Sequence, residues 1–486
     1  MLEAHALARP AHPALAMPGA DIGYPELIRR VRRCAAQLAR EGCRTPGSVG
    51  VAVDDDLGNI VASLALLALG VPQIALPASD PMPMRRQLAR RLSLAHVVVD
   101  DARAGVDGID TIVLAPVAVD GSAPAPPVAP VLVDPDAPAM YATSSGTTGV
   151  PKLFAHSQRT VGSRASQIAL AQGFAPDERV MVTMAVPTHL GKMARLNALW
   201  CGATAILPGT PSPSAPSLIE LCESLRVTYL QMTVLQARNL LLGFDGTRRL
   251  PPFTRVFLGA ARMPPGFPRA FESRVGGRVF DRYGTTEVNL IATTWPAGDE
   301  GVPDAVGRPA PGTLVEIVGD DGATCPPETI GEIRVRSDGM ASGYLDDPVA
   351  TARHFRGGWF YPGDVGAVTR DGVLRYLGRK DDMMILNGIN IFPAEIERVL
   401  EEHPAVGTAA AFPIPSSIYG DIPVAAVELN GRVPADAPML VAYSRERLGV
   451  RAPRKIVVVD ALPRNAAGKV VKRALAEMLA LRRSGG

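Results

Sequence analysis

One stretch of this chain has the residue types that a phosphate-binding loop needs. It reads TSSGTTGVPK, and its hydroxyl, glycine and cationic residues are Thr143, Ser144, Ser145, Gly146, Thr147, Thr148 and Lys152. Glycine lets the backbone approach an anion closely, hydroxyl and amide groups donate hydrogen bonds to phosphate oxygens, and lysine adds positive charge. Composition alone would favour a flexible Ser/Thr/Gly linker. A Walker loop is excluded, because Pro151 stands where that motif needs glycine before the lysine.

A second segment with reactive residue types follows an apolar stretch and reads DRYGTTE from Asp281 to Glu287. The Glu287 carboxylate suits Mg²⁺, a hard cation that prefers oxygen ligands and screens charge on a leaving pyrophosphate. Taken alone, the segment also fits a strand end with a helix-capping threonine. Three more segments are GWFYPGD ending at Asp364, GRKDD at 378–382 and LPRNAAGK ending at Lys469. Each of these alone is typical of a turn, a solvated connection or a basic surface.

In this order, the five segments resemble the motifs of the adenylate-forming superfamily, which includes acyl-CoA synthetases, adenylation domains of nonribosomal peptide synthetases and luciferases. The loop SSGTTGVPK is similar to that of acyl- and aryl-CoA ligases. The resemblance spans nearly the whole chain. It implies an enzyme that uses ATP and Mg²⁺ to join a carboxylic acid to AMP, and then passes the acyl group to a thiol.

The resemblance implies roles for individual residues. Lys469 would bridge the substrate carboxylate and the α-phosphate, where it stabilises charge as the mixed anhydride forms. Thr286 would contact the same phosphate, and Glu287 would hold Mg²⁺. The residues that would surround adenine, ribose and phosphate are Gly259, Ala260, Ala261, Asp281, Tyr283, Gly284, Asp364 and Arg379. Among these, Tyr283 would stack on adenine and Asp364 would hold both ribose hydroxyls.

The sequence indicates the residues that bind the substrate acid less strongly than it indicates the nucleotide site. The segment VPTHLGKM at 186–193 lacks the aspartate that anchors the amine in amino-acid-activating relatives, so a non-amino carboxylic acid is favoured. It resembles the Pro-x-x-His region of acyl-CoA ligases with one residue missing. The candidate pocket residues, each also compatible with ordinary packing, are His189, Lys192, Met232, Leu258 and Asn289. Lys192 or Arg195 could meet a second carboxylate on the substrate.

The thiol acceptor is either coenzyme A or the phosphopantetheine of a carrier protein, since both offer the same thiol arm. The resemblance places Gly388 in the tunnel for this arm, and glycine suits close backbone approach. Two alternatives stay open. One is a stand-alone enzyme that loads an amino or β-amino acid onto a carrier protein. The other is a degenerate nucleotide-binding module, against which the intact Lys469, Glu287 and Asp364 argue.

Hydrophobic patterning predicts the elements that must position these residues. A helix is expected at 24–40, and apolar strands alternate with helices as far as Asp281, which is typical of βαβ units in parallel sheets. From about residue 305, short alternating strands with Asp-Gly turns predict antiparallel hairpins and a small β-barrel. The predicted α/β fold has an N-terminal domain at 1–380, with its antiparallel subdomain at about 305–380. After residue 380 the pattern predicts an α+β domain at 381–486, and the family resemblance implies that this domain is mobile, carries Lys469 and has Asp381 as its hinge.

Composition narrows the function classes further. The chain has 486 residues, too many for one ordinary core, and a net charge of +2 without the basic excess of a nucleic-acid binder. Its five cysteines are scattered and form no CxxC pair, so neither disulfides nor a zinc site is expected. The apolar run at 60–76 is broken by glycine and proline, and residues 1–20 lack a signal-peptide pattern. A soluble, cytoplasmic enzyme without membrane insertion is predicted.

Overall fold

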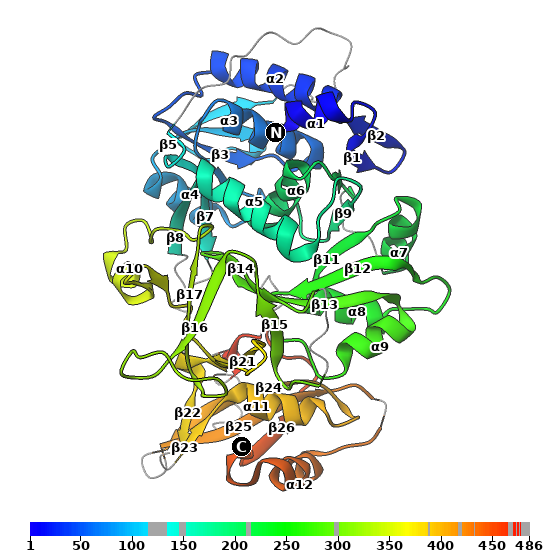
Figure 1. The fold of residues 1–486 in the computed structure, drawn as a ribbon, viewed down its shortest axis with the longest axis vertical. Coiled ribbons are helices and arrows are strands. Elements are labelled where there is room, and N and C mark those ends of the chain that lie inside the picture. Colours follow the sequence, from blue (N-terminus) through cyan, green and yellow to red (C-terminus); the bar gives the residue numbers. More distant parts are fainter. Residues whose placement is uncertain are drawn as a thin grey trace.

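The computed structural model describes residues 1–114, 134–144, 152–209, 215–295, 301–386, 389–416, 420–431, 433–464, 470–472, 474, 475 and 477. Within these residues the chain forms three sheets of six, fifteen and five strands. The six-stranded sheet and the five-stranded C-terminal sheet lie toward opposite ends of the longest axis, with most of the large sheet between them (Figure 1).

The six-stranded sheet flanks the predicted phosphate loop. Its order is β6-β5-β3-β4-β7-β8, and all neighbours are parallel except the antiparallel pair β7–β8. The strands are β3 (Ser48–Ala52), β4 (Gln73–Ala75), β5 (Leu94–Val99), β6 (Asp110–Val113), β7 (Pro138–Ser144) and β8 (Lys152–Ser157). The helices of this region are α2 (Tyr24–Arg40), α3 (Asp56–Ala68) and α4 (Met82–Arg91), with a 3-10 turn at Ala102–Ala104. The Asp55 side chain starts α3 by accepting a hydrogen bond from the amide of Gly58.

The first half of the large sheet is mostly parallel, in the order β13-β12-β11-β9-β10-β1, and β2 completes this edge as an antiparallel strand. Its strands are β1 (Pro13–Met17), β2 (Ala20–Gly23), β9 (Arg179–Val182), β10 (Thr204–Ile206), β11 (Tyr229–Thr233), β12 (Leu250–Gly259) and β13 (Gly276–Thr285). The accompanying helices are α1 (Leu2–Ala8), α5 (Gln158–Gln172), α6 (His189–Trp200), α7 (Ala215–Ser224), α8 (Val234–Leu242) and α9 (Phe267–Arg274). These elements confirm the predicted alternation of strand and helix.

The second half of the large sheet is antiparallel. Its elements are β14 (Asn289–Thr293), β15 (Ala305–Pro309), β16 (Thr313–Val318), β17 (Gly331–Ser337), α10 (Pro348–His354), β18 (Phe355–Arg356), β19 (Trp359–Phe360), β20 (Asp364–Val368) and β21 (Leu374–Arg379). The hairpins were expected, but the predicted small β-barrel is wrong. Strand β15 pairs with β14 on one side and β21 on the other, so the hairpins extend an open sheet and do not close on themselves.

The C-terminal sheet has a core of its own. It contains β22 (Met384–Leu386), β23 (Ile389–Ile391), β24 (Val406–Ser416), β25 (Gly420–Leu429) and β26 (Lys455–Val458), with α11 (Pro393–Glu401), α12 (Ala437–Leu448) and 3-10 turns at Lys380–Asp382 and Gly449–Arg451. Ile396 and Leu400 of α11 are buried against this sheet together with Leu440 of α12. The molecule is thus an α/β protein with a large N-terminal and a small C-terminal domain.

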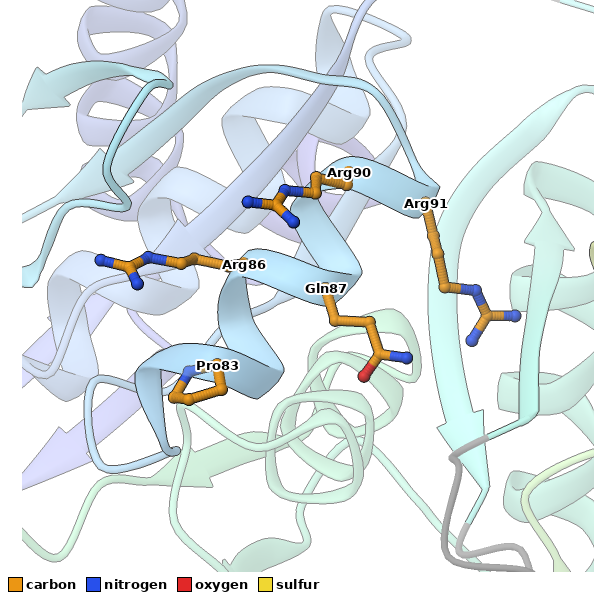
Figure 2. A pocket seen from close by; sticks show the side chains of 5 residues that line it. All are labelled: Pro83, Arg86, Gln87, Arg90 and Arg91. Atoms are coloured by element: carbon orange, nitrogen blue, oxygen red, sulfur yellow. The ribbon is translucent and has the colours of Figure 1, made fainter.

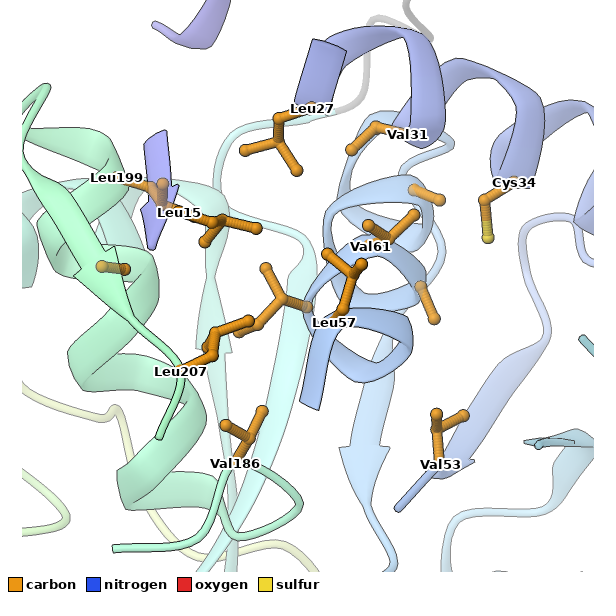
Figure 3. Packing of buried hydrophobic residues seen from close by; sticks show 14 of the residues in the cluster. Leu15, Leu27, Val31, Cys34, Val53, Leu57, Val61, Val186, Leu199 and Leu207 are labelled. Carbon is orange, nitrogen blue, oxygen red and sulfur yellow. The ribbon is translucent and has the colours of Figure 1, made fainter. Parts of the chain in front are cut away.

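Close packing fixes the N-terminal helices against the large sheet. Figure 3 shows Leu27 and Val31 of α2, Leu57 and Val61 of α3 and Leu199 of α6 in one buried cluster. Burying a side chain of this kind contributes roughly 1.5–3 kcal/mol. Within the described residues, the structure offers no helix with the length and apolar character that crossing a bilayer requires.

Candidate active site

The segment from Asp281 to Glu287 forms the end of β13 and the tight turn into β14. The pairing of the two strands shifts register between Tyr283 and Gly284. A Cβ at Gly284 would lie 2.0 Å from the carbonyl oxygen of Asn289, so only glycine fits this close approach. The buried Arg164 of α5 donates hydrogen bonds to the backbone oxygens of Thr286 (2.9 Å) and Glu287 (2.8 Å). The turn that carries these two residues is therefore clamped from α5.

Glu287 and Lys152 converge from different sheets. Glu287 is 6% exposed, and its Oε1 accepts a hydrogen bond of 2.9 Å from the Tyr344 hydroxyl. Lys152 starts β8; its Nζ lies 2.9 Å from Nε2 of His354 and 4.9 Å from the centre of the Tyr344 ring. Burial lowers the pKa of Lys152, and the negative charge of Glu287 partly opposes that effect. The end of the predicted phosphate loop thus lies beside the predicted Mg²⁺ ligand.

This arrangement fits a nucleotide-bound Mg²⁺. In the described part of the chain, no group of three or more His, Cys, Asp or Glu residues is positioned to hold a metal ion. Mg²⁺ commonly keeps several waters and binds through one or two carboxylates together with substrate phosphates. Glu287 can supply such a carboxylate, and Lys152 adds positive charge beside it.

Three residues predicted to contact the nucleotide meet at the junction of β13, β20 and β21. Asp364 is 3% exposed, and its Oδ1 accepts a 2.9 Å hydrogen bond from Nη1 of Arg379. Its Oδ2 accepts a hydrogen bond from the Tyr283 hydroxyl. The Tyr283 ring lies 5.5 Å from that of Tyr376, and burial together with the Asp364 charge raises the pKa of Tyr283. In this state both Asp364 oxygens are held by protein groups, so ribose hydroxyls would have to share or replace these bonds.

The remaining nucleotide candidates come from several other elements. Asp281 is buried, and burial raises the pKa of its carboxyl to about 7. Gly259 ends β12, where a Cβ would come within 2.9 Å of Cγ of Arg282. Ala260 and Ala261 follow it and are exposed, and Ala260 has a positive φ of 70°. Thr143 and Ser144 end β7, where Ser144 pairs with Lys152. Six predicted site residues lie outside the described residues: Ser145, Gly146, Thr147, Thr148, Gly388 and Lys469.

The pocket candidates lie on several elements. His189 and Lys192 begin α6, and the His189 ring stacks on that of His156 at 5.8 Å. Met232 and Leu258 are 2% and 0% exposed and belong to the core that packs with α8 and α9. The side chain of Asn289 donates a 3.1 Å hydrogen bond to Oε1 of Gln167 on α5.

Two family models match this chain. The model described as AMP-binding enzyme matches residues 2–345, and the model described as AMP-binding enzyme C-terminal domain matches residues 395–469. The chain belongs to the AMP-binding enzyme family.

Full-length similarity supports the same assignment of this AMP-binding enzyme. It is 30% identical to the indoleacetate–CoA ligase of Aromatoleum aromaticum, over 99% of this chain and 97% of that protein. It is 31% identical to phosphinothricin tripeptide synthetase PhsC of Streptomyces viridochromogenes over 99% of this chain, which spans 45% of that longer protein. The structure of the Bacillus subtilis o-succinylbenzoate coenzyme A synthetase in complex with AMP superimposes with a TM-score of 0.85 at 26% identity, covering 98% and 97% of the two chains.

The connection between the two domains of this AMP-binding enzyme contains the predicted hinge. Asp381 lies in the 3-10 turn between β21 of the large sheet and β22 of the C-terminal sheet. Both of its carboxylate oxygens accept from Nη2 of Arg353 at 3.0 Å. Arg464 and Val470, on either side of the segment that contains Lys469, pair as an antiparallel bridge.

Several residues that shape the site were not found from the sequence. Arg164, Tyr344 and His354 belong to no recognisable motif, and each reaches the site from an element distant in the chain. Nδ1 of His354 lies 2.8 Å from the backbone oxygen of Tyr361, which orients the ring toward Lys152. Only the tertiary fold reveals these contacts, because a single histidine or tyrosine carries no positional signal in a sequence.

A surface hollow of about 370 Å³ lies apart from these residues. Figure 2 shows that it is formed along α4, and its lining residues are Pro83, Arg86, Gln87, Arg90 and Arg91. None of them was predicted to contact the nucleotide or the acid. Arg86 forms an ion pair with Asp107, and Arg91 donates to the backbone oxygen of Leu345 at 3.3 Å.

Proposed function

We propose that this AMP-binding enzyme activates a non-amino carboxylic acid with ATP and transfers the acyl group to the thiol of coenzyme A. The observation that carries the proposal is the meeting of Lys152 with Glu287 beside the Tyr283–Asp364–Arg379 group. Together they offer cationic and carboxylate contacts for phosphates and Mg²⁺ next to an aromatic face and a ribose-binding carboxylate. These are the groups that acid activation by ATP requires.

In the proposed first half-reaction, an oxygen of the substrate carboxylate attacks the α-phosphorus of ATP. The bond from that phosphorus to the pyrophosphate oxygen breaks, and acyl-AMP and pyrophosphate result. Bound Mg²⁺ would neutralise charge on the leaving pyrophosphate, held by Glu287. Lys152, the phosphate loop with Ser145 and Thr147, and Lys469 would position the reacting groups and stabilise the developing charge.

In the proposed second half-reaction, the thiol sulfur attacks the acyl carbon and AMP leaves. We propose that the domain at 381–486 turns about Asp381 between the two half-reactions, so that Lys469 withdraws and Gly388 approaches the pantetheine arm. The position of Asp381 in a short turn between two separately packed sheets supports this hinge. We also propose a cytoplasmic location, because all five cysteines are free thiols.

Coenzyme A is favoured as acceptor because the indoleacetate–CoA ligase matches this chain over nearly its whole length. A carrier-protein phosphopantetheine is the second candidate, and the match to a peptide synthetase favours it. The amino-acid alternative is disfavoured because the comparable segment at 186–193 contains no aspartate or glutamate that could anchor the amine.

Acid-dependent exchange of pyrophosphate into ATP tests the first half-reaction. Purified enzyme is assayed with a panel of aliphatic, aromatic and amino acids, and non-amino acids are expected to support exchange. The best acid is then offered with coenzyme A, with a phosphopantetheinylated carrier protein and with an amine, and products are identified by mass spectrometry. A coenzyme A thioester supports the proposal. The proposal is contradicted if only amino acids support exchange, or if none of the acids tested supports it.

A further inference from the structure

A basic cluster lies next to the turn that carries Thr286 and Glu287. We define it as His156, Arg164, His189 and Lys192, which come from β8, α5 and the start of α6. Lys192 and His156 are 0% exposed. His156 and His189 stack at 5.8 Å, and the positive charges of Arg164 and Lys192 both lower the pKa of His189. Because Arg164 holds the backbone of the turn, the basic cluster extends directly from the predicted site of acid activation.

Apart from Arg164, which is hydrogen-bonded, the residues of this cluster have buried polar atoms without partners among the described residues. In the part of the chain that the structure describes, no partner hydrogen-bonds to Nζ of Lys192, to either ring nitrogen of His156 or to Nδ1 of His189. Burial lowers the pKa of Lys192 to about 7 and that of His189 to about 3. Among the described residues, no carboxylate offsets the burial of Lys192, whereas the charge of Glu287 partly offsets the burial of Arg164. Buried cations are normally paired, since an unpaired one is strongly destabilising.

Arg195, in the same helix, is a buried cation whose hydrogen bonds indicate a structural role. It lies three residues after Lys192 and is 1% exposed. Its guanidinium donates hydrogen bonds to the backbone oxygens of Val182 (2.7 Å), Gly191 (2.9 Å) and Met184 (3.0 Å). These bonds occupy Arg195 in fixing the start of α6, so it is not available to a substrate. In Arg195 both terminal nitrogens are bonded and Nε alone has no partner among the described residues, whereas the whole ammonium group of Lys192 has none there.

We infer that the enzyme's acid substrate is a dicarboxylic acid whose second carboxylate accepts hydrogen bonds from Nζ of Lys192, with the histidines of the basic cluster beside it. The inference rests on the proposed function and specifies its substrate class. One carboxylate would be activated beside Glu287, and the other would supply the negative charge that the basic cluster lacks. Bound substrate would thereby satisfy donors that are unpaired in the free enzyme.

The test compares dicarboxylic acids with monocarboxylic acids of matched chain length in the pyrophosphate exchange assay. In the wild-type enzyme, dicarboxylic acids are expected to give the higher kcat/KM. Lys192→Met should lower that value about 30-fold for the best dicarboxylic acid and change it less than about threefold for the matched monocarboxylic acid. Lys192→Gln keeps a hydrogen-bond donor, so its kcat/KM for the dicarboxylic acid should lie between those of the wild type and Lys192→Met. Lys455→Met is the matched control, because Lys455 is exposed on β26, and it should leave both values unchanged.

Thermal unfolding without substrate gives an independent result. Because Lys192 is buried and unpaired, Lys192→Met should raise the unfolding temperature by a few degrees, which also shows that the variant folds. A lower unfolding temperature combined with unchanged acid preference would overturn the inference, since Lys192 would then be a structural residue. Exchange that prefers monocarboxylic acids in the wild type would also overturn it, while leaving the proposed function intact. If no acid of either kind supported exchange, the proposed function itself would be rejected.

Discussion

At the scale of single residues, chemistry depends on groups that the sequence separates and the fold brings together. Lys152 and Glu287 are 135 positions apart in numbering, yet both contact Tyr344. The two charges partly compensate each other, and both are largely shielded from solvent. A nucleotide with its Mg²⁺ would therefore meet a site whose charged groups are already oriented, which is the condition for effective electrostatic stabilisation.

Glu287→Gln should lower the rate of acid-dependent pyrophosphate exchange about 100-fold, because a neutral amide is a poor ligand for Mg²⁺. Raising the Mg²⁺ concentration should recover part of the loss. Tyr344→Phe is the control, since it removes the hydrogen bond to Glu287 and keeps the carboxylate. A Glu287→Gln enzyme that exchanges pyrophosphate at the wild-type rate would exclude Glu287 as the metal ligand.

Asp281 makes folding stability depend on pH. Its pKa is raised by burial from 3.8 to about 7, so the folded chain holds the proton more tightly than the unfolded chain between these values. The contribution of Asp281 to stability therefore falls as pH rises from about 4 to about 7 and stays constant above. Asp281→Asn lacks this titration, so the free energy of unfolding of the variant minus that of the wild type should increase by roughly 2.5 kcal/mol from about pH 5 to pH 8. Thermal unfolding at both pH values measures this, and an equal difference at the two would show that the carboxyl does not titrate in that range.

At the scale of elements, the β13–β14 turn depends on one glycine. Gly284→Ala would place a Cβ 2.0 Å from a backbone oxygen, so the hairpin must shift. We expect a loss of about 2 kcal/mol in the free energy of unfolding and weaker nucleotide binding, because Thr286 and Glu287 would move off the Arg164 clamp. Gly23→Ala is a matched control, since Gly23 has φ −72° and its nearest neighbour would be 3.5 Å from the new Cβ. Denaturant unfolding and nucleotide titration of the two variants should differ clearly; similar losses would contradict the role of Gly284.

Elements with a strong local pattern could be predicted, and those that depend on distant partners could not. The helix expected at 24–40 is α2 (Tyr24–Arg40), because its apolar residues repeat with helical spacing and bury one face. The antiparallel hairpins were expected from alternation and turn residues, but the barrel was not found. Strand β15 pairs with β14 and β21 because of tertiary packing, and the local sequence does not indicate these partners. Tyr344 and His354 were not predicted, because their contacts also depend on tertiary packing.

At the scale of the whole molecule, the C-terminal domain is held by a few polar contacts. Arg262, next to the small-residue end of β12, forms an ion pair with Glu401 of α11. Arg398 of α11 lies 3.4 Å from Asp304, and Arg238 of α8 donates to the backbone oxygen of Gly407 at 2.6 Å. Polar contacts of this kind can be exchanged as a domain moves, whereas a large apolar interface would hold one orientation.

Asp381→Pro tests the hinge, because proline fixes φ and removes an amide donor within the connecting turn. Pyrophosphate exchange should stay within about threefold of wild type, while thioester formation should fall at least about tenfold. Asp381→Asn serves as control: it weakens the pairing with Arg353 but leaves the backbone free, and it should spare both half-reactions. Equal losses of the two half-reactions in Asp381→Pro would exclude a pivot at this residue.

The proposed function depends most on acid activation by Lys469 at the ATP site. The most direct measurement is acid-dependent exchange of radiolabelled pyrophosphate into ATP by the wild type and by Lys469→Ala, with ATP binding measured separately. We expect exchange in the wild type, a loss of at least about 100-fold in the variant and nearly unchanged ATP binding. Exchange of equal rate in both proteins, or none in the wild type with any acid, would contradict the proposed function.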